Sequence, residues 1–218
     1  MARLRPASTA TTVALIGIVL VIVAIQMSLP PSVTVGPTWL IPVIELGGIP
    51  IAIALTMWLG SDEPVVRAIM TAYLVFLVLA CVTNAVLLLV SLLRGSEDTG
   101  EYLLFAGFGV LAINVLSFGL VYWWIDGGGP GRRSDGTVTL PDFLFPQQGQ
   151  GQTEWRPGLI DYLFTAYTNI IAFSPTDTMP LTHRVKILFT VQSATALLTV
   201  VVTLSRAVNL IPGGLPGT

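Results

Sequence analysis

Residues 68–93 read AIMTAYLVFLVLACVTNAVLLLVSLL, a run of 26 residues without a charged side chain. A helix of about 20 apolar residues is long enough to cross the hydrocarbon core of a bilayer. A helix also suits that core because it satisfies its backbone hydrogen bonds within the segment. The run therefore predicts a transmembrane helix.

Four further runs have the same character: residues 10–29, 39–59, 102–125 and 185–210. The chain is 53% hydrophobic and 10% charged, whereas soluble domains carry roughly 25% charged residues. Its net charge of −2 is spread thinly and forms no basic face, which argues against nucleic acid as a partner. The composition predicts an all-α membrane protein whose partner is the lipid bilayer.

Short links with turn-forming residues join the first four runs, so consecutive helices are expected to be antiparallel neighbours. One long polar segment follows, rich in Gly and Gln and too small for a second domain. The predicted organisation is a four-helix transmembrane bundle (1–125), a polar loop (126–157), a short helix, turn and final transmembrane helix (158–211), and a tail (212–218).

The segment after the polar loop departs from the pattern of long runs. Asp161 precedes an apolar run at 162–173, and its 12 residues favour a re-entrant or interfacial helix over a full crossing. Capping and the helix dipole favour a carboxylate at a helix start, so Asp161 is interpreted as structural. Ser174 precedes Pro175, which ends the helix. The sequence predicts five spans plus a short re-entrant helix before the last span, or six spans.

A short helix, a polar turn and a long apolar helix resemble the pore loop and inner helix of the potassium-channel superfamily. In that family an aspartate follows the filter, then a proline and a threonine, and Asp177, Pro180 and Thr182 stand at the same spacing. The resemblance implies a cation pore at 158–211, enclosed by a tetramer. It implies these pore-lining or filter-like residues: Thr168, Asn169, Ser174, Pro175, Thr176, Asp177 and Thr178.

The positions that correspond to the filter sequence Thr-Val-Gly-Tyr-Gly are residues 172–176, and they contain no glycine. A potassium filter lines up carbonyl oxygens through backbone conformations that glycine reaches at low cost. Pro175 fixes its own φ and does not copy that geometry. Potassium selectivity by the usual filter is therefore not expected.

Three motifs are similar to those of a bacterial family of small, uncharacterised multi-pass membrane proteins. They lie at residues 122–130 (YWWIDGGGP), 141–146 (PDFLFP) and 172–182 (AFSPTDTMPLT). The resemblance implies a membrane protein with a pore-like end, in the inner membrane of a bacterial cell, and supplies no activity.

Basic residues favour the cytoplasmic side of a membrane, so the ten Arg and Lys residues test the topology. Five spans with a cytoplasmic N-terminus place eight of the ten inside, and six spans place seven inside. The orientation of a potassium channel would place eight outside. Either a pore loop therefore enters from the cytoplasm, as in ionotropic glutamate receptors, or the segment is a crossing helix and the resemblance to a channel is accidental.

Glu45 lies within the second run, and an ionisable residue there is costly unless it faces the bundle interior or water. It is a candidate for proton or cation movement, or else for pairing with Asn84, Asn114 or Gln192. Asp177 has two interpretations: part of an acidic ring at a cation pathway, or a turn residue that bonds to its neighbours.

The leading hypothesis is an ion-channel-like protein that conducts cations, as a homo-oligomer. One alternative is a non-conducting partner or assembly factor in a larger membrane complex, with residues 141–146 as its contact surface. Another is a small proton-coupled transporter that uses Glu45. With one cysteine (Cys81) and one histidine (His183), and no hydrolase or protease motif, the chain predicts no metal site, no cofactor and no enzyme.

Overall fold

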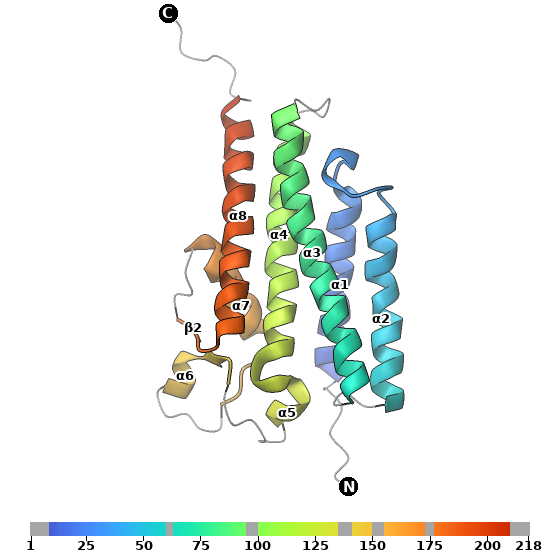
Figure 1. The fold of residues 1–218 in the computed structure, drawn as a ribbon, viewed down its shortest axis with the longest axis vertical. Coiled ribbons are helices and arrows are strands. Elements are labelled where there is room, and N and C mark those ends of the chain that lie inside the picture. Colours follow the sequence, from blue (N-terminus) through green and yellow to red (C-terminus); the bar gives the residue numbers. More distant parts are fainter. Residues whose placement is uncertain are drawn as a thin grey trace, which may run out of the picture.

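The computed structural model describes residues 9–59, 63–94, 100–134, 141–149, 155–172 and 177–209. The chain is nearly all helical, and long helices lie side by side along one direction (Figure 1). The long helices are α1 (Thr9–Ser28), α2 (Leu40–Leu59), α3 (Pro64–Arg94), α4 (Gly100–Ile125) and α8 (His183–Asn209). A 3-10 turn, η1 (Pro31–Val33), joins α1 to α2.

Each of the five predicted runs forms a helix, with ends within four residues of the expected ones. Four helices are long and apolar enough to cross a membrane: Ala10–Ser28, Pro64–Arg94, Glu101–Gly128 and His183–Ser205. In α2 the apolar stretch found is Leu40–Thr56, which is shorter. The coarse prediction of a multi-pass α-helical membrane protein is thereby confirmed, with four candidate spans plus shorter apolar helices.

Helix α4 packs against α1, α3, α7 and α8 and is the centre of the bundle. Small residues allow close approach of neighbouring helices. A Cβ atom at Gly107 of α4 would lie 2.0 Å from the hydroxyl of Thr203 in α8. One at Gly48 of α2 would lie 2.0 Å from the ring of Tyr73 in α3. Glycine is therefore required at both contacts.

Short elements gather at the end of the bundle where α4 ends and α8 begins (Figure 1). They are η2 (Asp126–Gly128), α5 (Pro130–Ser134), β1 (Phe143–Leu144), α6 (Pro146–Gly149) and β2 (Met179–Pro180), and we call them the cap. Strands β1 and β2 are antiparallel, with Phe143 opposite Pro180 and Leu144 opposite Met179. In the described residues, the predicted polar loop (126–157) contains η2, α5, β1 and α6, and its strand β1 pairs with β2 in the predicted turn before α8.

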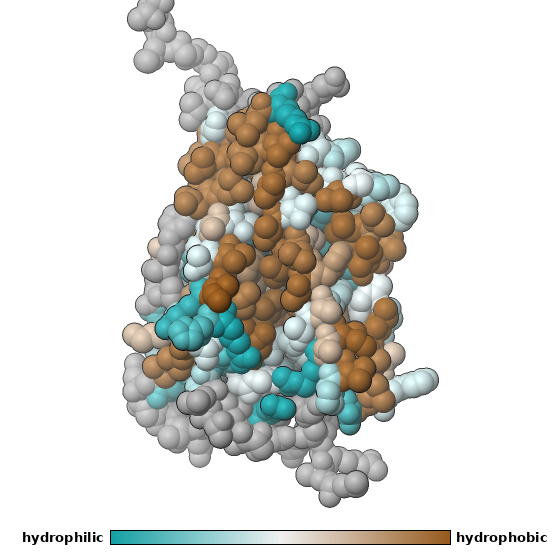
Figure 2. Space-filling view, viewed as in Figure 1, coloured by the Kyte–Doolittle hydropathy of each residue, from teal (hydrophilic) through white to brown (hydrophobic). Residues whose placement is uncertain are grey.

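Helix α7 (Leu159–Ile171) has 13 residues and packs against α4 and α8. Its inward face is partly polar, and its outward face is apolar. The buried side chains are Tyr162, Thr165, Ala166, Asn169 and Ile170, and the exposed ones include Ile160, Phe164, Tyr167 and Ile171. Apolar residues also cover most of the long-helix surface in Figure 2, with hydrophilic residues toward its ends. This distribution is the one expected of a protein surrounded by lipid.

Candidate functional site

The cap is organised around the buried carboxylate of Asp126 at the end of α4. One carboxylate oxygen accepts hydrogen bonds from the backbone N–H groups of Asp142 (2.8 Å) and Phe143 (3.3 Å). The other accepts a hydrogen bond from the hydroxyl of Tyr162 in α7. Asp126 therefore ties the end of α4 to the strand before α7 and to α7 itself.

Asp142 makes the second set of connections in the cap, and its side chain is 1% exposed. It accepts hydrogen bonds from the backbone N–H of Gly127 (3.0 Å) and from the hydroxyl of Thr182 (2.6 Å). The guanidinium of Arg184 forms a two-pronged ion pair with the same carboxylate. Burial raises the pKa of Asp142, but these hydrogen bonds and the Arg184 charge outweigh burial and hold the pKa below its ordinary value.

The three motifs noted in the sequence are thus parts of one structure. Asp126 belongs to the first motif, Asp142 and Phe143 to the second, and Thr182 to the third. The backbone N–H of Leu181 also donates to the carbonyl of Asp142 (2.8 Å). All three sequence motifs consequently supply residues that build the cap.

A second polar cluster lies deeper in the bundle, around the fully buried Gln192 of α8. Its side-chain oxygen accepts hydrogen bonds from the hydroxyl of Tyr122 (2.7 Å) and the amide of Asn169 (2.8 Å). Its amide donates to the carbonyl of Ala166 (3.0 Å). The hydroxyl of Ser193 donates to the Asn169 side chain (3.2 Å). We call Tyr122, Asn169, Gln192 and Ser193 the α7–α8 network.

The side chain of Gln192 in α8 is bonded to groups from two other helices, Tyr122 of α4 and Asn169 and Ala166 of α7. Interhelical hydrogen bonds of this kind fix helices relative to one another inside a membrane. In the sequence Gln192 was considered as a partner of Glu45, whereas in the structure its side chain bonds to α4 and α7.

Phe143 and Phe145, the proposed contact surface of an assembly factor, are buried within the chain. The ring of Phe143 lies 5.4 Å from Tyr122, 5.7 Å from Tyr162 and 5.9 Å from Phe189, between ring centroids. Phe145 packs on Trp155 and on Tyr162. These side chains hold the cap onto α4, α7 and α8 and present no exposed apolar face to a partner.

The pore-lining candidates lie in different environments. Asn169 is buried and bonded to α8, whereas Thr168 is half-buried and donates to the carbonyl of Thr165 (3.1 Å). Thr178 is buried, and Thr165 donates to its hydroxyl (3.2 Å). Asp177 is exposed. Ser174, Pro175 and Thr176 lie outside the described residues, so the filter-like turn stays a prediction.

Glu45 is 1% exposed, and one oxygen of its carboxylate has no hydrogen-bond partner. The hydroxyl of Tyr73 donates to its backbone carbonyl, at 2.7 Å, and not to its side chain. Of the partners considered for it, Asn84 pairs with Gln26 of α1 at 2.7 Å. In α4, the side-chain oxygens of Asn114 and Ser117 are also buried without a partner.

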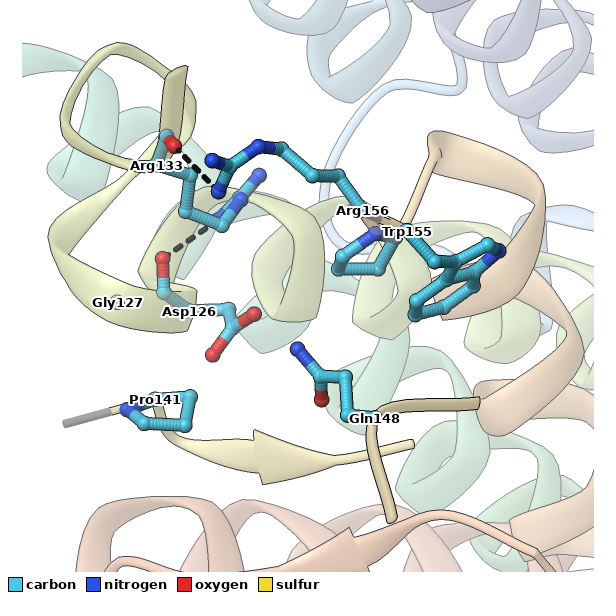
Figure 3. Close-up of a pocket in the computed structure, with 8 residues that line it drawn as sticks. Asp126, Gly127, Arg133, Pro141, Gln148, Trp155 and Arg156 are labelled. Atoms are coloured by element: carbon cyan, nitrogen blue, oxygen red, sulfur yellow. Dashed lines mark hydrogen bonds between the residues drawn. The ribbon is translucent and has the colours of Figure 1, made fainter. Parts of the chain in front are cut away.

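An open cavity of about 180 Å³ lies in the cap, and Figure 3 shows the residues around it. It is bounded by Asp126, Arg133, Gln148, Trp155 and Arg156. Two arginines line it from α5 and from the segment before α7. From the sequence, these two arginines contributed only to the count of basic residues on each side of the membrane.

Within the described ranges, no three His, Cys, Asp or Glu side chains are grouped so as to hold a metal ion. Cys81 is fully buried, as expected of a small apolar residue. No protein-family model, curated protein or solved structure matches this chain.

Proposed function

We propose that this chain is a five-span inner-membrane protein of bacteria that passes small cations as a homo-oligomer, with α7 as a re-entrant helix at the pathway. The observation that carries the proposal is the attachment of both flanks of α7 to the same end of the bundle. Strand β1 precedes α7, β2 follows it, and the two strands pair.

Side chains reinforce this attachment on each side of α7. Tyr162, in the first turns of the helix, bonds to Asp126 at the end of α4. Thr182, after the helix, bonds to Asp142 in the segment before it. A helix that crossed the membrane would separate its flanks by the thickness of the bilayer, about 30 Å. The paired strands argue against that separation.

The contacts with α8 support the depth expected of a re-entrant helix. Asn169, near the end of α7, bonds to Gln192, which is nine residues after the start of α8. Nine residues correspond to about 14 Å of helix, and the 27 residues of α8 to about 40 Å. Helix α7 thus extends beside the first half of α8 and ends there.

The C-terminal end of α7 must be shielded from lipid if it lies within the membrane. Ile171 is 62% exposed in the single chain, and Ala172 is also exposed. Irregular backbone at membrane depth is tolerated where it is buried in protein or lines a water-filled cavity. A second copy of the chain would bury this backbone in protein, and a central aqueous path would supply the water-filled cavity. This favours a homo-oligomer, which is a tetramer if the channel resemblance holds.

Asp177 is the acidic residue of the segment that returns from α7 to the cap. Its exposure leaves the carboxylate available to attract cations, and a symmetric assembly repeats that charge around the axis. The absence of glycine from residues 172–176 argues against potassium selectivity of the usual kind.

Cation flux into liposomes that contain the purified full-length chain tests the proposal. We expect flux from the wild type, a several-fold loss in Asp177→Asn, and no loss in Glu63→Gln, an exposed acid at the same end. A protein that reconstitutes as a folded oligomer but passes no Na⁺, K⁺ or H⁺ would exclude the conducting function.

A second candidate function is proton-coupled transport through Glu45, and its unpartnered buried oxygen favours it. A carboxyl group in that position can bind and release a proton if water reaches it. In that case Glu45→Gln abolishes transport driven by a pH gradient. Under the channel proposal Glu45→Gln leaves Na⁺ and K⁺ flux intact, so the same variant distinguishes the two functions.

A further inference from the structure

The cavity in the cap is lined by two arginines, Arg133 and Arg156, and among the described residues neither forms an ion pair with the carboxylate in the cavity wall, Asp126. Arg156 donates to the backbone carbonyl of Arg133 (3.2 Å), and the two side chains run beside each other in Figure 3. Arg133 itself donates to the carbonyls of Trp123 and Asp126. In the part of the chain that the structure describes, the ion pair found is Arg184 with Asp142, and neither Arg133 nor Arg156 takes part in one.

Two adjacent positive charges repel each other, and an anion between or beside them removes that cost. The negative group already in the cavity wall is Asp126, but its oxygens accept hydrogen bonds from two backbone N–H groups and from Tyr162. The charge of Asp126 is therefore already stabilised, and the three ionised side chains around the cavity sum to a positive charge.

Neutral groups complete the polar wall. The side-chain oxygen of Gln148 accepts from the backbone N–H of Phe145 (3.1 Å), which leaves its NH₂ group on the cavity side (Figure 3). Trp155 packs on Phe145 and forms the apolar wall. Tryptophan is enriched where a protein meets the headgroup region of a membrane.

We propose that this cavity binds a phosphate group, and that the headgroup of an anionic lipid supplies it. Guanidinium groups form paired hydrogen bonds to phosphate oxygens, which gives arginine sites their preference for this group. The cavity lies where α4 ends, at the end of the bundle that also carries Arg184 and Lys186. That concentration of basic residues is typical of the cytoplasmic side, where anionic lipids attract them.

The test compares full-length protein in phosphatidylcholine nanodiscs with protein in nanodiscs that also contain phosphatidylglycerol. Native mass spectrometry counts the retained lipid, and thermal unfolding measures its effect. The variant is Arg156→Gln, whose side chain is exposed and bonds to one carbonyl. Its matched control is Arg94→Gln, an exposed arginine at the opposite end of the bundle.

We expect the wild type and Arg94→Gln to retain phosphatidylglycerol over phosphatidylcholine and to unfold at a higher temperature with it. Loss of a charged hydrogen-bond donor weakens binding roughly tenfold, so Arg156→Gln should lose most of both effects. A second arm adds inorganic phosphate, against chloride at equal ionic strength, to protein in neutral detergent. Stabilisation in this arm, lost in Arg156→Gln, together with no lipid effect, would identify a soluble phosphate compound as the source.

Equal behaviour of Arg156→Gln and Arg94→Gln in both arms would overturn the phosphate site. The result does not depend on conduction, because lipid retention and unfolding are measured without ion flux. Arg156→Lys adds a check on geometry: it keeps the charge but not the paired donors, and should recover less than half of the lost affinity.

Discussion

Two regions of the molecule bury polar side chains in opposite ways. In the cap and the α7–α8 network, Asp126, Asp142 and Gln192 use their side-chain oxygens in hydrogen bonds from several elements. In α2 and α4, side-chain oxygens of Glu45, Asn114 and Ser117 are buried without partners, and in the cap the side-chain oxygen of Gln147 is too. A buried group with its bonds made stabilises a fold, whereas one without them costs free energy.

The side chains with hydrogen-bond partners are those that position α7. The side-chain oxygens without partners are the ones that can bind water or a proton. The bonded side chains of Asp126, Asp142 and Gln192 fix both flanks and the inner face of α7. The unsatisfied oxygens are free to hold water or a proton inside the bundle. The four predictions below change one region at a time, and stability should respond in the first and much less in the second.

The largest loss of stability is expected from Asp126→Ala. The change leaves the N–H groups of Asp142 and Phe143 and the hydroxyl of Tyr162 without their acceptor. At about 1–3 kcal/mol for each buried group left unpaired, the total is roughly 3–5 kcal/mol after relaxation. Thermal unfolding in detergent measures it, with Glu63→Gln as the control. A loss below about 1 kcal/mol would show that the cap does not depend on this carboxylate.

Asp142→Asn should cost about 2 kcal/mol, because Arg184 is 57% exposed and regains water when the ion pair is lost. This residue also predicts a dependence on pH. The pKa of Asp142 is lowered in the folded chain, so its contribution is complete above its unfolded pKa of about 3.9. The contribution is lost as the pH falls below that value and through the lower folded pKa.

Between pH 7 and pH 3, protonation of Asp142 should therefore lower the free energy of unfolding at the acid end of the range. Asp142→Asn should lack that part of the decrease. Equal acid sensitivity of the two proteins would assign the effect to other carboxylates.

Gln192→Leu should cost about 1–2 kcal/mol, since interhelical hydrogen bonds inside a membrane contribute modestly. The change removes the side-chain acceptor of the Tyr122 hydroxyl and of the Asn169 amide. Combining it with Tyr122→Phe should recover part of the loss, because the orphaned hydroxyl is then removed. The control is Thr190→Val, on the exposed face of α8. Strictly additive losses in the double variant would argue against the Tyr122–Gln192 bond.

The smallest effect is expected from Glu45→Gln. Its buried oxygen has no partner to lose, so stability should change by less than about 1 kcal/mol, in either direction. Chemical unfolding of both proteins in the same detergent measures the difference. A loss comparable to that of Asp126→Ala would mean that Glu45 is a structural residue like those of the cap.

The helices could be predicted from the sequence because span length and apolar character are local properties. Residues 162–173 were predicted as a short helix, and α7 covers Leu159–Ile171. Asp161 was predicted to stabilise the helix start, and its carboxylate accepts from the backbone N–H of Gly158 (2.7 Å).

The cap and the α7–α8 network could not be predicted, because their bonds join residues far apart in the chain. Asp142 is 42 residues from Arg184, and Tyr122 is 70 residues from Gln192. No local periodicity reports such pairs. Phe143 and Phe145 have the composition of an exposed interfacial segment, and only their packing on Tyr122, Tyr162 and Trp155 identifies them as core residues.

The central claim is that both flanks of α7 lie on the same side of the membrane. It is tested by labelling single cysteines, in a Cys81→Ser background, with a membrane-impermeant thiol reagent in sealed vesicles of known orientation. Gly158→Cys and Met179→Cys flank α7 at exposed positions, and Arg94→Cys marks the opposite end. At Gly158 the new Cβ meets the carboxylate of Asp161 at an ordinary 3.6 Å.

We predict that Gly158→Cys and Met179→Cys are labelled from the same side of the membrane and Arg94→Cys from the other. Labelling of Gly158→Cys and Met179→Cys from opposite sides would contradict it, because α7 would then cross the membrane.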